Sequence, residues 1–249
     1  MSKNNAVSSE NVKQNRAKAK KDSAWIVLGA ICIIAALCLG IVNGITNPII
    51  AKLTEETAQN TRRAMLPQAV SFEPVEGIEG VDCVWRGLDA EMKTVGYVGE
   101  ITVTGFGGKI VVTAGLDLDK KMTGISVGGS DFSETAGLGA KAKGTATESE
   151  HNEFLDQFLT EENKDASKQY EIVKSGAAGV SDMNDIDAIT SATKTSNAIV
   201  TGNVSGTDPQ NGGINKLCAV ICQLIDQEKQ AANAVASAET SEQKEGVGE

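Results

Sequence analysis

The sequence predicts an α+β protein in which one membrane-spanning helix precedes a globular domain of ~130 residues. Residues 23–51 carry no charged side chain, and residues 24–42 are wholly apolar or glycine. Farther along, glycine-rich runs of strand-forming residues fill the middle of the chain, and helical patterns follow them. Together these observations separate a membrane anchor from a domain that contains both strands and helices.

The uncharged segment is long enough to be a transmembrane helix, because ~20 apolar residues cross the ~30 Å hydrocarbon layer of a bilayer. A cleaved secretory signal is the alternative, but its apolar region would be roughly 7–15 residues long, and no A-x-A cleavage site follows here. A lipoprotein anchor fits poorly, since Cys32 and Cys38 follow Ile31 and Leu37 rather than small residues. We therefore expect an uncleaved helix at residues 23–46.

The distribution of charge indicates the orientation of this helix. The 249 residues include 23 basic and 33 acidic side chains, a net charge of −10. Residues 1–22 contain six basic and two acidic side chains, so they carry +4, and residues 23–249 carry −14. By the positive-inside rule the N-terminus is cytoplasmic and the acidic domain is extracytoplasmic. This predicts a single-pass protein of the cell (inner) membrane that contacts membrane lipid, and the acidic balance argues against nucleic-acid binding.

The segments around the membrane helix have different characters. Residues 1–22 show no apolar periodicity and are expected to be disordered or to lie at the membrane surface. After the membrane helix, Asn47-Pro48 is expected to kink or interrupt the chain before a connecting helix over residues 47–68, which Leu66-Pro67 ends.

The globular domain is expected to span residues 69–205, with strands at residues 94–104 and 109–114 and a helix near residues 150–159. A polar loop at residues 202–213 follows.

An amphipathic helix is predicted within residues 206–233, because Leu217, Val220, Ile221 and Leu224 share one face of a helix. Residues 234–249 show no core-forming pattern and are interpreted as a disordered acidic tail.

Composition limits the chemistry that the domain can perform. His151 is the one histidine, which excludes His-rich metal sites, and it lies in a charged segment typical of a solvated surface. The five cysteines include no C-x-x-C pair, which excludes a four-thiolate cluster. Cys218 and Cys222 lie four residues apart on one helical face, so we expect them to pack. No metal site and no complete active site follow from these residues.

Two glycine-rich motifs are candidate phosphate-binding loops. Residues 139–145 nearly fit a P-loop, but Thr145 occupies the position where a lysine must reach the phosphates. Residues 105–108, GFGG, lack the third spaced glycine of a dinucleotide fingerprint and on their own predict a hairpin turn.

A third segment, residues 187–196 (DAITSATKTS), combines five hydroxyl side chains with small spacers ahead of a helix-compatible run. Hydroxyl groups and free N–H groups at the start of a helix offer hydrogen-bond donors to an anion. Helix capping by redundant Ser and Thr residues is the alternative interpretation.

Three motifs in this order resemble those of the FMN-binding domain family. Residues 187–193, DAITSAT, resemble its D-x-x-[ST]-G-A-[ST] motif; residues 105–110, GFGGKI, resemble G-Y-G-G-x-I; and residues 134–141, ETAGLGAK, resemble E-T-P-G-L-G-x-K. With the apolar N-terminal segment, the resemblance covers about residues 22–205 and is to the G-subunit family of Rnf ferredoxin:NAD oxidoreductase complexes. The homologous C-subunit family of the sodium-pumping NADH:quinone oxidoreductases is an alternative.

The resemblance implies a twisted antiparallel sheet with flanking helices and a flavin at a loop-rich edge. A separate flavin transferase would join the phosphate of FMN covalently to Thr193, and its recognition sequence would be Asp187, Thr190, Ser191 and Ala192. The residues expected against the isoalloxazine ring are Glu134, Thr135, Leu138 and Gly139, with Phe106 and Gly107 approaching from the neighbouring turn.

The sequence departs from the family pattern at three places. Ser191 stands where the motif has Gly, so a positive φ at this position would cost on the order of 1 kcal/mol. Ala136 replaces Pro, and Phe132-Ser133 stands where many members have His.

The function that the resemblance implies is electron transfer by covalent FMN within a membrane-bound, ion-translocating ferredoxin:NAD oxidoreductase complex. The partners would be the other membrane and iron–sulfur subunits, and the ion path would lie in them. Two alternatives of other classes remain: a membrane-anchored extracytoplasmic binding or assembly module that has lost its flavin, and a flavoprotein reductase that acts alone.

Overall fold

The computed structural model describes residues 4–174, 177, 179, 182–205 and 212–245. The chain divides into two compact units, one ending at Thr57 and one beginning at Ala58, and each is described by itself. Helix α1 (Asn4–Met65) makes up the first unit and contributes its last turns to the second.

Helix α1 is continuous where the sequence analysis expected separate segments. It begins at Asn4, within the basic segment expected to be disordered or to lie at the membrane surface, and it passes through Pro48 without interruption. The last part of the basic segment, residues 16–21 (RAKAKK), consists of Arg, Ala and Lys, which have high helix propensity and extend an apolar helix that is already formed.

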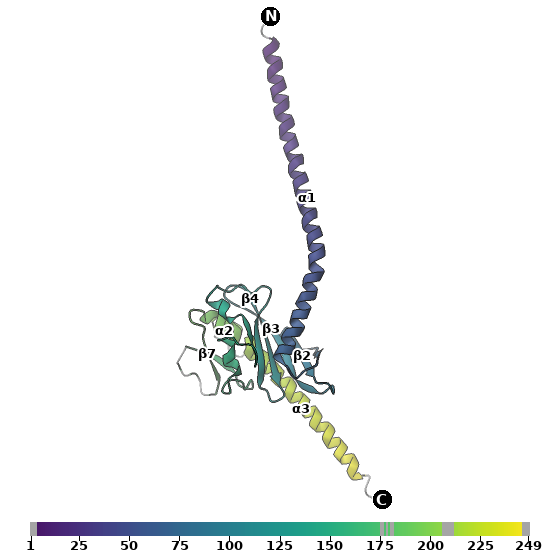
Figure 1. Cartoon of the computed structure of the whole chain (residues 1–249), viewed down its shortest axis with the longest axis vertical. Helices are drawn as coiled ribbons and strands as arrows, with labels where there is room; N and C mark the ends of the chain where they lie inside the picture. Colours follow the sequence, from purple (N-terminus) through teal and green to yellow (C-terminus); the bar gives the residue numbers. More distant parts are fainter. Residues whose placement is uncertain (1–3, 175–176, 178, 180–181, 206–211, 246–249) are drawn as a thin grey trace. The chain divides into compact units, whose positions relative to one another are not determined.

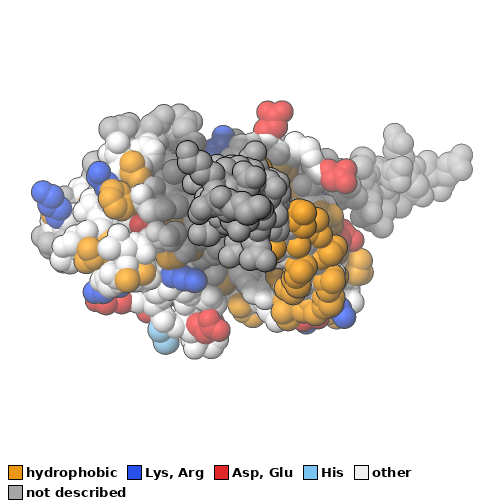
Figure 2. Space-filling view, turned by 90° about the horizontal axis from the view of Figure 1, so that it is seen from above, with side chains coloured by type: hydrophobic (Ala, Val, Ile, Leu, Met, Phe, Trp, Pro, Cys, Tyr) orange, Lys and Arg blue, Asp and Glu red, His pale blue; other side chains and the backbone are white. Residues whose placement is uncertain are grey.

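Exposed large hydrophobic side chains concentrate on α1. Figure 2 shows a block of hydrophobic side chains, in orange, on the surface. The exposed large hydrophobic residues between Trp25 and Leu53 all belong to α1. Within the described residues, one helix is long and apolar enough to cross a membrane: Trp25–Met65, whose most apolar window has a mean hydropathy of 2.8. Its composition suits hydrocarbon better than water.

The second unit is built on a six-stranded antiparallel sheet in which neighbouring strands are consecutive in sequence. The strands are β1 (Ser71–Pro74), β2 (Cys83–Leu88), β3 (Thr94–Thr104), β4 (Lys109–Asp117), β5 (Met122–Gly128) and β6 (Gly144–Ala146). The expected antiparallel sheet is confirmed, and so are the strands predicted at residues 94–104 and 109–114. A separate parallel pair, β7 (Tyr170–Val173) and β8 (Asn184–Asp187), was not foreseen.

The main core lies between one face of the sheet and the helices α2 (Thr193–Thr201) and α3 (Gly213–Glu245) (Figure 1). Alternate residues of β3 point to this face, and Gly99 lies so close to α3 that an added Cβ would stand 2.6 Å from Leu217 Cδ1. Members of this core from the sheet and from both helices include Tyr97, Ile101, Ile110, Ile199, Leu217 and Ile221, each at most 7% exposed.

The opposite face of the sheet holds the end of α1 in a trough of glycines. Met65 and Leu66 are completely buried there. The trough is formed by one glycine from each of four adjacent strands, and a Cβ on any of them would press on Met65 or Leu66: Gly87, Gly96, Gly115 and Gly124. The Thr123 hydroxyl also donates a hydrogen bond to the carbonyl of Met65. The glycine pattern thus seats the end of the helix on the sheet.

Two segments differ from the expected helices. Residues 150–154 form a loop, and only Leu155–Leu159 form a short 3-10 helix, η2, because the Asn152 side chain accepts the N–H groups of Phe154 and Leu155 and so starts the helical turn after residue 152. Helix α3 continues past residue 233 to Glu245, through Ala, Glu, Gln and Lys, which favour helix. Residues 206–211 of the predicted loop and 246–249 of the predicted tail lie outside the described residues.

Candidate cofactor site

A cavity of about 370 Å³ lies where three segments of the second unit meet. These are the β3–β4 turn, the loop leading into the 3-10 helix η1 (Gly139–Ala142), and the start of α2. The volume falls within the ~300–1,000 Å³ range of small-molecule sites. The lining residues are Phe106, Glu134, Thr135, Leu138, Gly139, Ser191, Ala192, Thr193, Lys194 and Thr195.

The structure brings most of the sequence-predicted site residues together. Eight of the eleven line this cavity, and Gly107 donates its backbone N–H to Glu134, which lines it. Asp187 and Thr190 do not line it; they line an adjacent cavity of about 600 Å³ with Gln157 and Lys141. The loop before α2 therefore separates two hollows.

The hydroxyl side chains of residues 187–196 differ in exposure: some are buried and others are accessible. Thr195 and Ser196 are at most 2% exposed, and both have hydrogen bonds within the protein. The Ser196 hydroxyl accepts the N–H of Ile189 at 3.0 Å, which closes the turn ahead of the helix. Ser191 and Thr193 are exposed and face the cavity.

The start of α2 presents uncapped backbone donors to the cavity. Thr193 is the first residue of the helix, and Ala192 at the N-cap position provides no side-chain cap. The first N–H groups of a helix have no intrahelical partner and carry a partial positive charge, so this end suits an anion.

Ser191 adopts the left-handed conformation, with φ 64°. The position therefore has the geometry for which the family pattern uses Gly, and the Cβ of Ser191 is accommodated at a cost of on the order of 1 kcal/mol. The strained residue forms part of the turn that directs the chain into α2.

Glu134 lies between two walls of the cavity. One carboxylate oxygen accepts the N–H of Gly107 at 2.9 Å, and the other accepts the hydroxyl of Thr195 at 2.7 Å. Glycine backbones pack closely beside the carboxylate: a Cβ added to Gly139 would stand 2.7 Å from its Oε2, and one added to Gly105 would overlap Oε1. These glycines leave the space that the carboxylate fills.

The outer wall of the cavity combines an aromatic ring with a cation. Phe106 is 63% exposed, and the ammonium of Lys194 lies 5.3 Å from the centre of its ring. Phe106 and Leu138 are two of only four exposed large hydrophobics outside α1 in the described part of the chain. An exposed aromatic face beside a cavity can stack on a flat ring.

The backbone of Asp187 is held by Gln157. The Gln157 side chain accepts the N–H of Asp187 at 2.7 Å and donates to its carbonyl at 3.3 Å, so the amide holds the last residue of β8 by both of its backbone groups. Sequence reasoning missed Gln157, Lys194 and Thr195. The last two stand inside the quoted hydroxyl-rich run, whereas nothing in the sequence links Gln157 to it.

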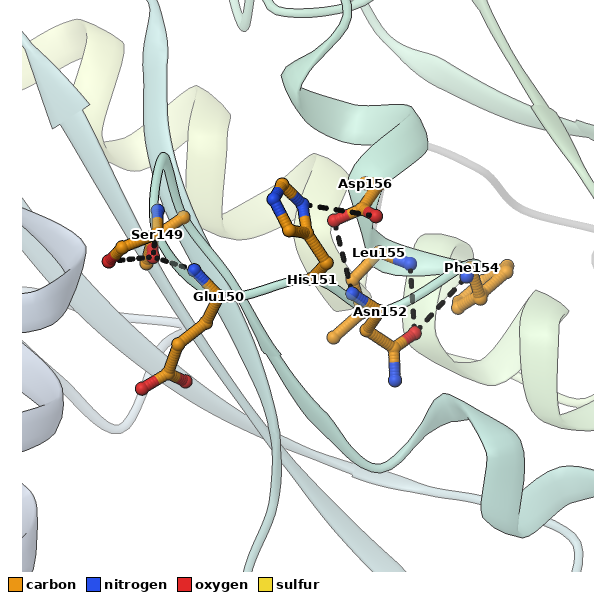
Figure 3. Close-up of polar contacts among 8 residues, drawn as sticks. Ser149, Glu150, His151, Asn152, Phe154, Leu155 and Asp156 are labelled. Atoms are coloured by element: carbon orange, nitrogen blue, oxygen red, sulfur yellow. Dashed lines mark hydrogen bonds and ion pairs between the residues drawn. The ribbon is translucent and has the colours of Figure 1, made fainter.

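The remaining candidate groups do not form a site. Figure 3 shows His151 beside Asp156, with 3.6 Å between Nδ1 and Oδ2, and the imidazole is 75% exposed, as expected of a solvated histidine. Cys218 and Cys222 are buried in the core, and burial raises the pKa of the Cys222 thiol to about 11. Among the described residues no three His, Cys, Asp or Glu side chains are grouped to hold a metal ion.

Comparison with known proteins gives consistent matches. The FMN-binding domain family matches residues 105–203. The G subunit of the Na⁺-translocating ferredoxin:NAD⁺ oxidoreductase complex of Acetobacterium woodii is 31% identical over 191 residues, which cover 71% of this chain and 85% of that protein. The G subunit of the ion-translocating oxidoreductase complex of Methanosarcina acetivorans is 31% identical over 182 residues, 70% of this chain and 86% of that protein.

Among solved structures, this chain is similar to the crystal structure of the C subunit of Na⁺-translocating NADH-quinone reductase from Parabacteroides distasonis. The sequences are 20% identical, the TM-score is 0.36, and the match covers 53% of this chain and 61% of that chain.

Proposed function

The chain belongs to the G-subunit family of ion-translocating ferredoxin:NAD oxidoreductase (Rnf) complexes, and from this premise we propose that it transfers electrons through FMN held covalently on Thr193. The attachment site is inferred from which hydroxyl groups at the start of α2 are exposed and which are buried. Thr195 and Ser196 are buried and engaged, so they are not open to modification. Of the accessible hydroxyls, Thr193 alone belongs to the first turn of the helix and faces the cavity.

The residues present fit an FMN group. The uncapped N–H groups at the start of α2 would receive the phosphate, and Lys194 is the one basic side chain among the residues that line the cavity. The exposed ring of Phe106 and the side chain of Leu138 offer apolar surface for the flat ring system.

The role of the protein residues is to hold and shield the cofactor. When bound, FMN supplies one- and two-electron transfer, chemistry that no side chain of the cavity provides. The described residues around the cavity include no histidine or cysteine and no paired acid and base. An electron carrier needs none of these, because binding, orientation and exclusion of water are the tasks left to the chain.

The wider assembly follows from the family. The relatives are subunits of ion-translocating complexes, so we assign this chain to a membrane complex with other membrane and iron–sulfur subunits. We also assign its modification to a flavin transferase. Helix α1 would anchor it with the N-terminus in the cytoplasm and the FMN domain outside. The ion path would lie in other subunits, because the apolar core of α1 at residues 24–42 contains no ionisable side chain other than two cysteine thiols.

Intact-protein and peptide mass spectrometry test the attachment. Protein from cells that contain the transferase should carry one added FMN phosphoester mass, on the peptide that includes Thr193. Thr193→Ala should abolish the added mass, whereas the matched control Thr193→Ser, which keeps a hydroxyl at this position, should retain it. Unmodified wild-type protein, or modification that persists in Thr193→Ala, would contradict the proposal.

Copurification separates the proposal from its alternatives. A member of a larger complex should be recovered with membrane and iron–sulfur proteins after mild detergent extraction. Flavin-dependent turnover by the chain without partners would instead favour a reductase acting alone. An unmodified chain recovered with partners would favour a binding or assembly module.

A further inference from the structure

The three walls of the cavity are distant in sequence, and one side chain is hydrogen-bonded to both of the other walls. Gly107 belongs to the β3–β4 turn, Glu134 to the loop before η1, and Thr195 to α2. The hydrogen bonds of Glu134 span 27 residues to Gly107 and 61 residues to Thr195. A single carboxylate thus links all three segments.

The surroundings of this carboxylate are shaped to hold it by two hydrogen bonds. Each oxygen receives its own donor, at 2.9 and 2.7 Å, and hydrogen bonds to a charged acceptor are among the stronger ones in proteins. The Thr195 side chain is almost completely buried, so its hydroxyl has little access to water as an alternative partner. Gly105 and Gly139 lie against opposite oxygens, where any Cβ would displace the carboxylate.

The directions of these hydrogen bonds also limit how the Glu134 carboxylate can contact a ligand. Both oxygens are directed at protein donors, so the carboxylate stabilises the arrangement of the walls. A cavity whose walls are fixed before binding loses less conformational entropy when a ligand enters.

We propose that Glu134 and Thr195 are positioning residues: the carboxylate clasps the β3–β4 turn to the start of α2 and thereby preorganises the cavity for a flavin. This inference rests on the proposed function for the identity of the ligand. It changes the role expected for Glu134, from a contact of the flavin ring to the link that holds the ring's site together, and it gives Thr195 a role of its own.

The first test needs no flavin. Hydrogen exchange followed by mass spectrometry on the detergent-solubilised full chain measures protection of the Gly107 amide. Gly107 is exposed, so its protection depends on the bond to Glu134. Exchange should accelerate at least about tenfold in Glu134→Ala, which removes an amide bond to a charged acceptor. Equal exchange rates in the wild type and Glu134→Ala would overturn the clasp.

The second test compares two substitutions of Thr195 in a Thr193→Ala background, where FMN can bind only reversibly. Thr195→Val keeps the shape and removes the hydroxyl, and it should weaken FMN binding about tenfold, the loss expected for one hydrogen bond to a charged group. Thr195→Ser keeps the hydroxyl and should bind within about twofold of its parent. Quenching of flavin fluorescence gives the affinities, and the visible circular dichroism of bound FMN should change in the Val variant and be restored in the Ser variant.

The outcomes are distinguishable from failure of the proposed function. Equal FMN affinity and equal dichroism in the Val and Ser variants would overturn the positioning role. If wild-type protein from cells that contain the transferase carried no FMN while Gly107 remained protected only in the presence of Glu134, the proposed function would fail and the clasp would stand. Thermal unfolding of each variant verifies that the domain is folded.

Discussion

Ser191 illustrates how one residue can keep a demanding backbone conformation without glycine. Its φ of 64° lies in the left-handed region, which costs a residue with a Cβ on the order of 1 kcal/mol. The neighbouring turn determines this conformation, because Ala192 donates its N–H to the carbonyl of Ile189 and Ser196 bonds back to the same loop. The strain is therefore held by contacts on both sides.

Ser191→Gly should stabilise the domain. Glycine adopts a positive φ without steric cost, so the free energy of unfolding should rise by about 1 kcal/mol. Thermal unfolding followed by circular dichroism measures the change. Ser191→Ala keeps the Cβ and serves as the control, and an equal effect of both substitutions would show that the backbone conformation is not the cause.

Glu100 provides a residue-scale prediction about pH. Burial, followed by repulsion from Asp82, raises the pKa of this carboxyl above its ordinary value of 4.5 in the folded state. A raised pKa in an acid means that the folded protein binds the proton more tightly than the unfolded chain. The stability that the protonated Glu100 carboxyl contributes is therefore fully present below pH 4.5, and it is lost as the pH rises through the folded-state pKa.

Glu100→Gln should remove the loss of stability that ionisation of Glu100 causes at higher pH. The variant should gain melting temperature relative to the wild type at pH 7 and gain less at pH 4, where the wild-type carboxyl is protonated. Thermal unfolding at the two pH values measures the difference. A gain of equal size at both would indicate a packing effect instead of a titration.

At the scale of the elements, the glycine trough explains how α1 ends on the sheet. Glycine in a strand ordinarily weakens the strand, and here four neighbouring strands each contribute one. The compensation is the complete burial of Met65 and Leu66.

Gly115→Ala should therefore be strongly destabilising. The new Cβ would overlap the carbonyl of Met65, which is backbone and moves only with the end of the helix. Overpacking of this kind costs about 2 kcal/mol. Gly128→Ala, in the adjacent strand β5, is the matched control because nothing lies within 4 Å of its added Cβ. Chemical denaturation of both variants decides whether the trough or general glycine content matters.

Elements with a regular pattern were predictable from the sequence, and those set by single side chains were not. Strand β3 has the expected bounds because most of residues 94–104 are β-branched or aromatic, with glycines between them. The helix expected near residues 150–159 shortened to η2 because Asn152 turns its side chain back on the following N–H groups. Periodicity does not report such local competition.

The candidate site divides in the same way. Thr193 and the residues of the three motifs could be named from sequence, and most of them line one cavity. The partnership of Thr195 with Glu134 could not, because it depends on how segments 61 residues apart are brought together by the fold. The clamp of Gln157 on Asp187 depends likewise on packing.

At the scale of the whole molecule, the charge distribution predicts topology. With +4 on residues 1–22 and −14 on the remainder, the domain should lie outside the cytoplasm. Protease added to intact spheroplasts should digest the domain and leave an N-terminal epitope tag protected, with a cytoplasmic protein as the control for lysis. Digestion of the domain only after lysis would reverse the orientation.

The separation of the cavity walls has a consequence for the order of events during biogenesis. Contacts between distant segments form late in folding, because closing a long loop is entropically costly before the contact rewards it. Thr193 follows the other two walls in the chain, so we expect its helix to complete the cavity last. A covalent group found on Thr193 with its ring seated in the cavity therefore records a completed fold, and the fraction of flavin protected from solvent would measure folding yield in the membrane.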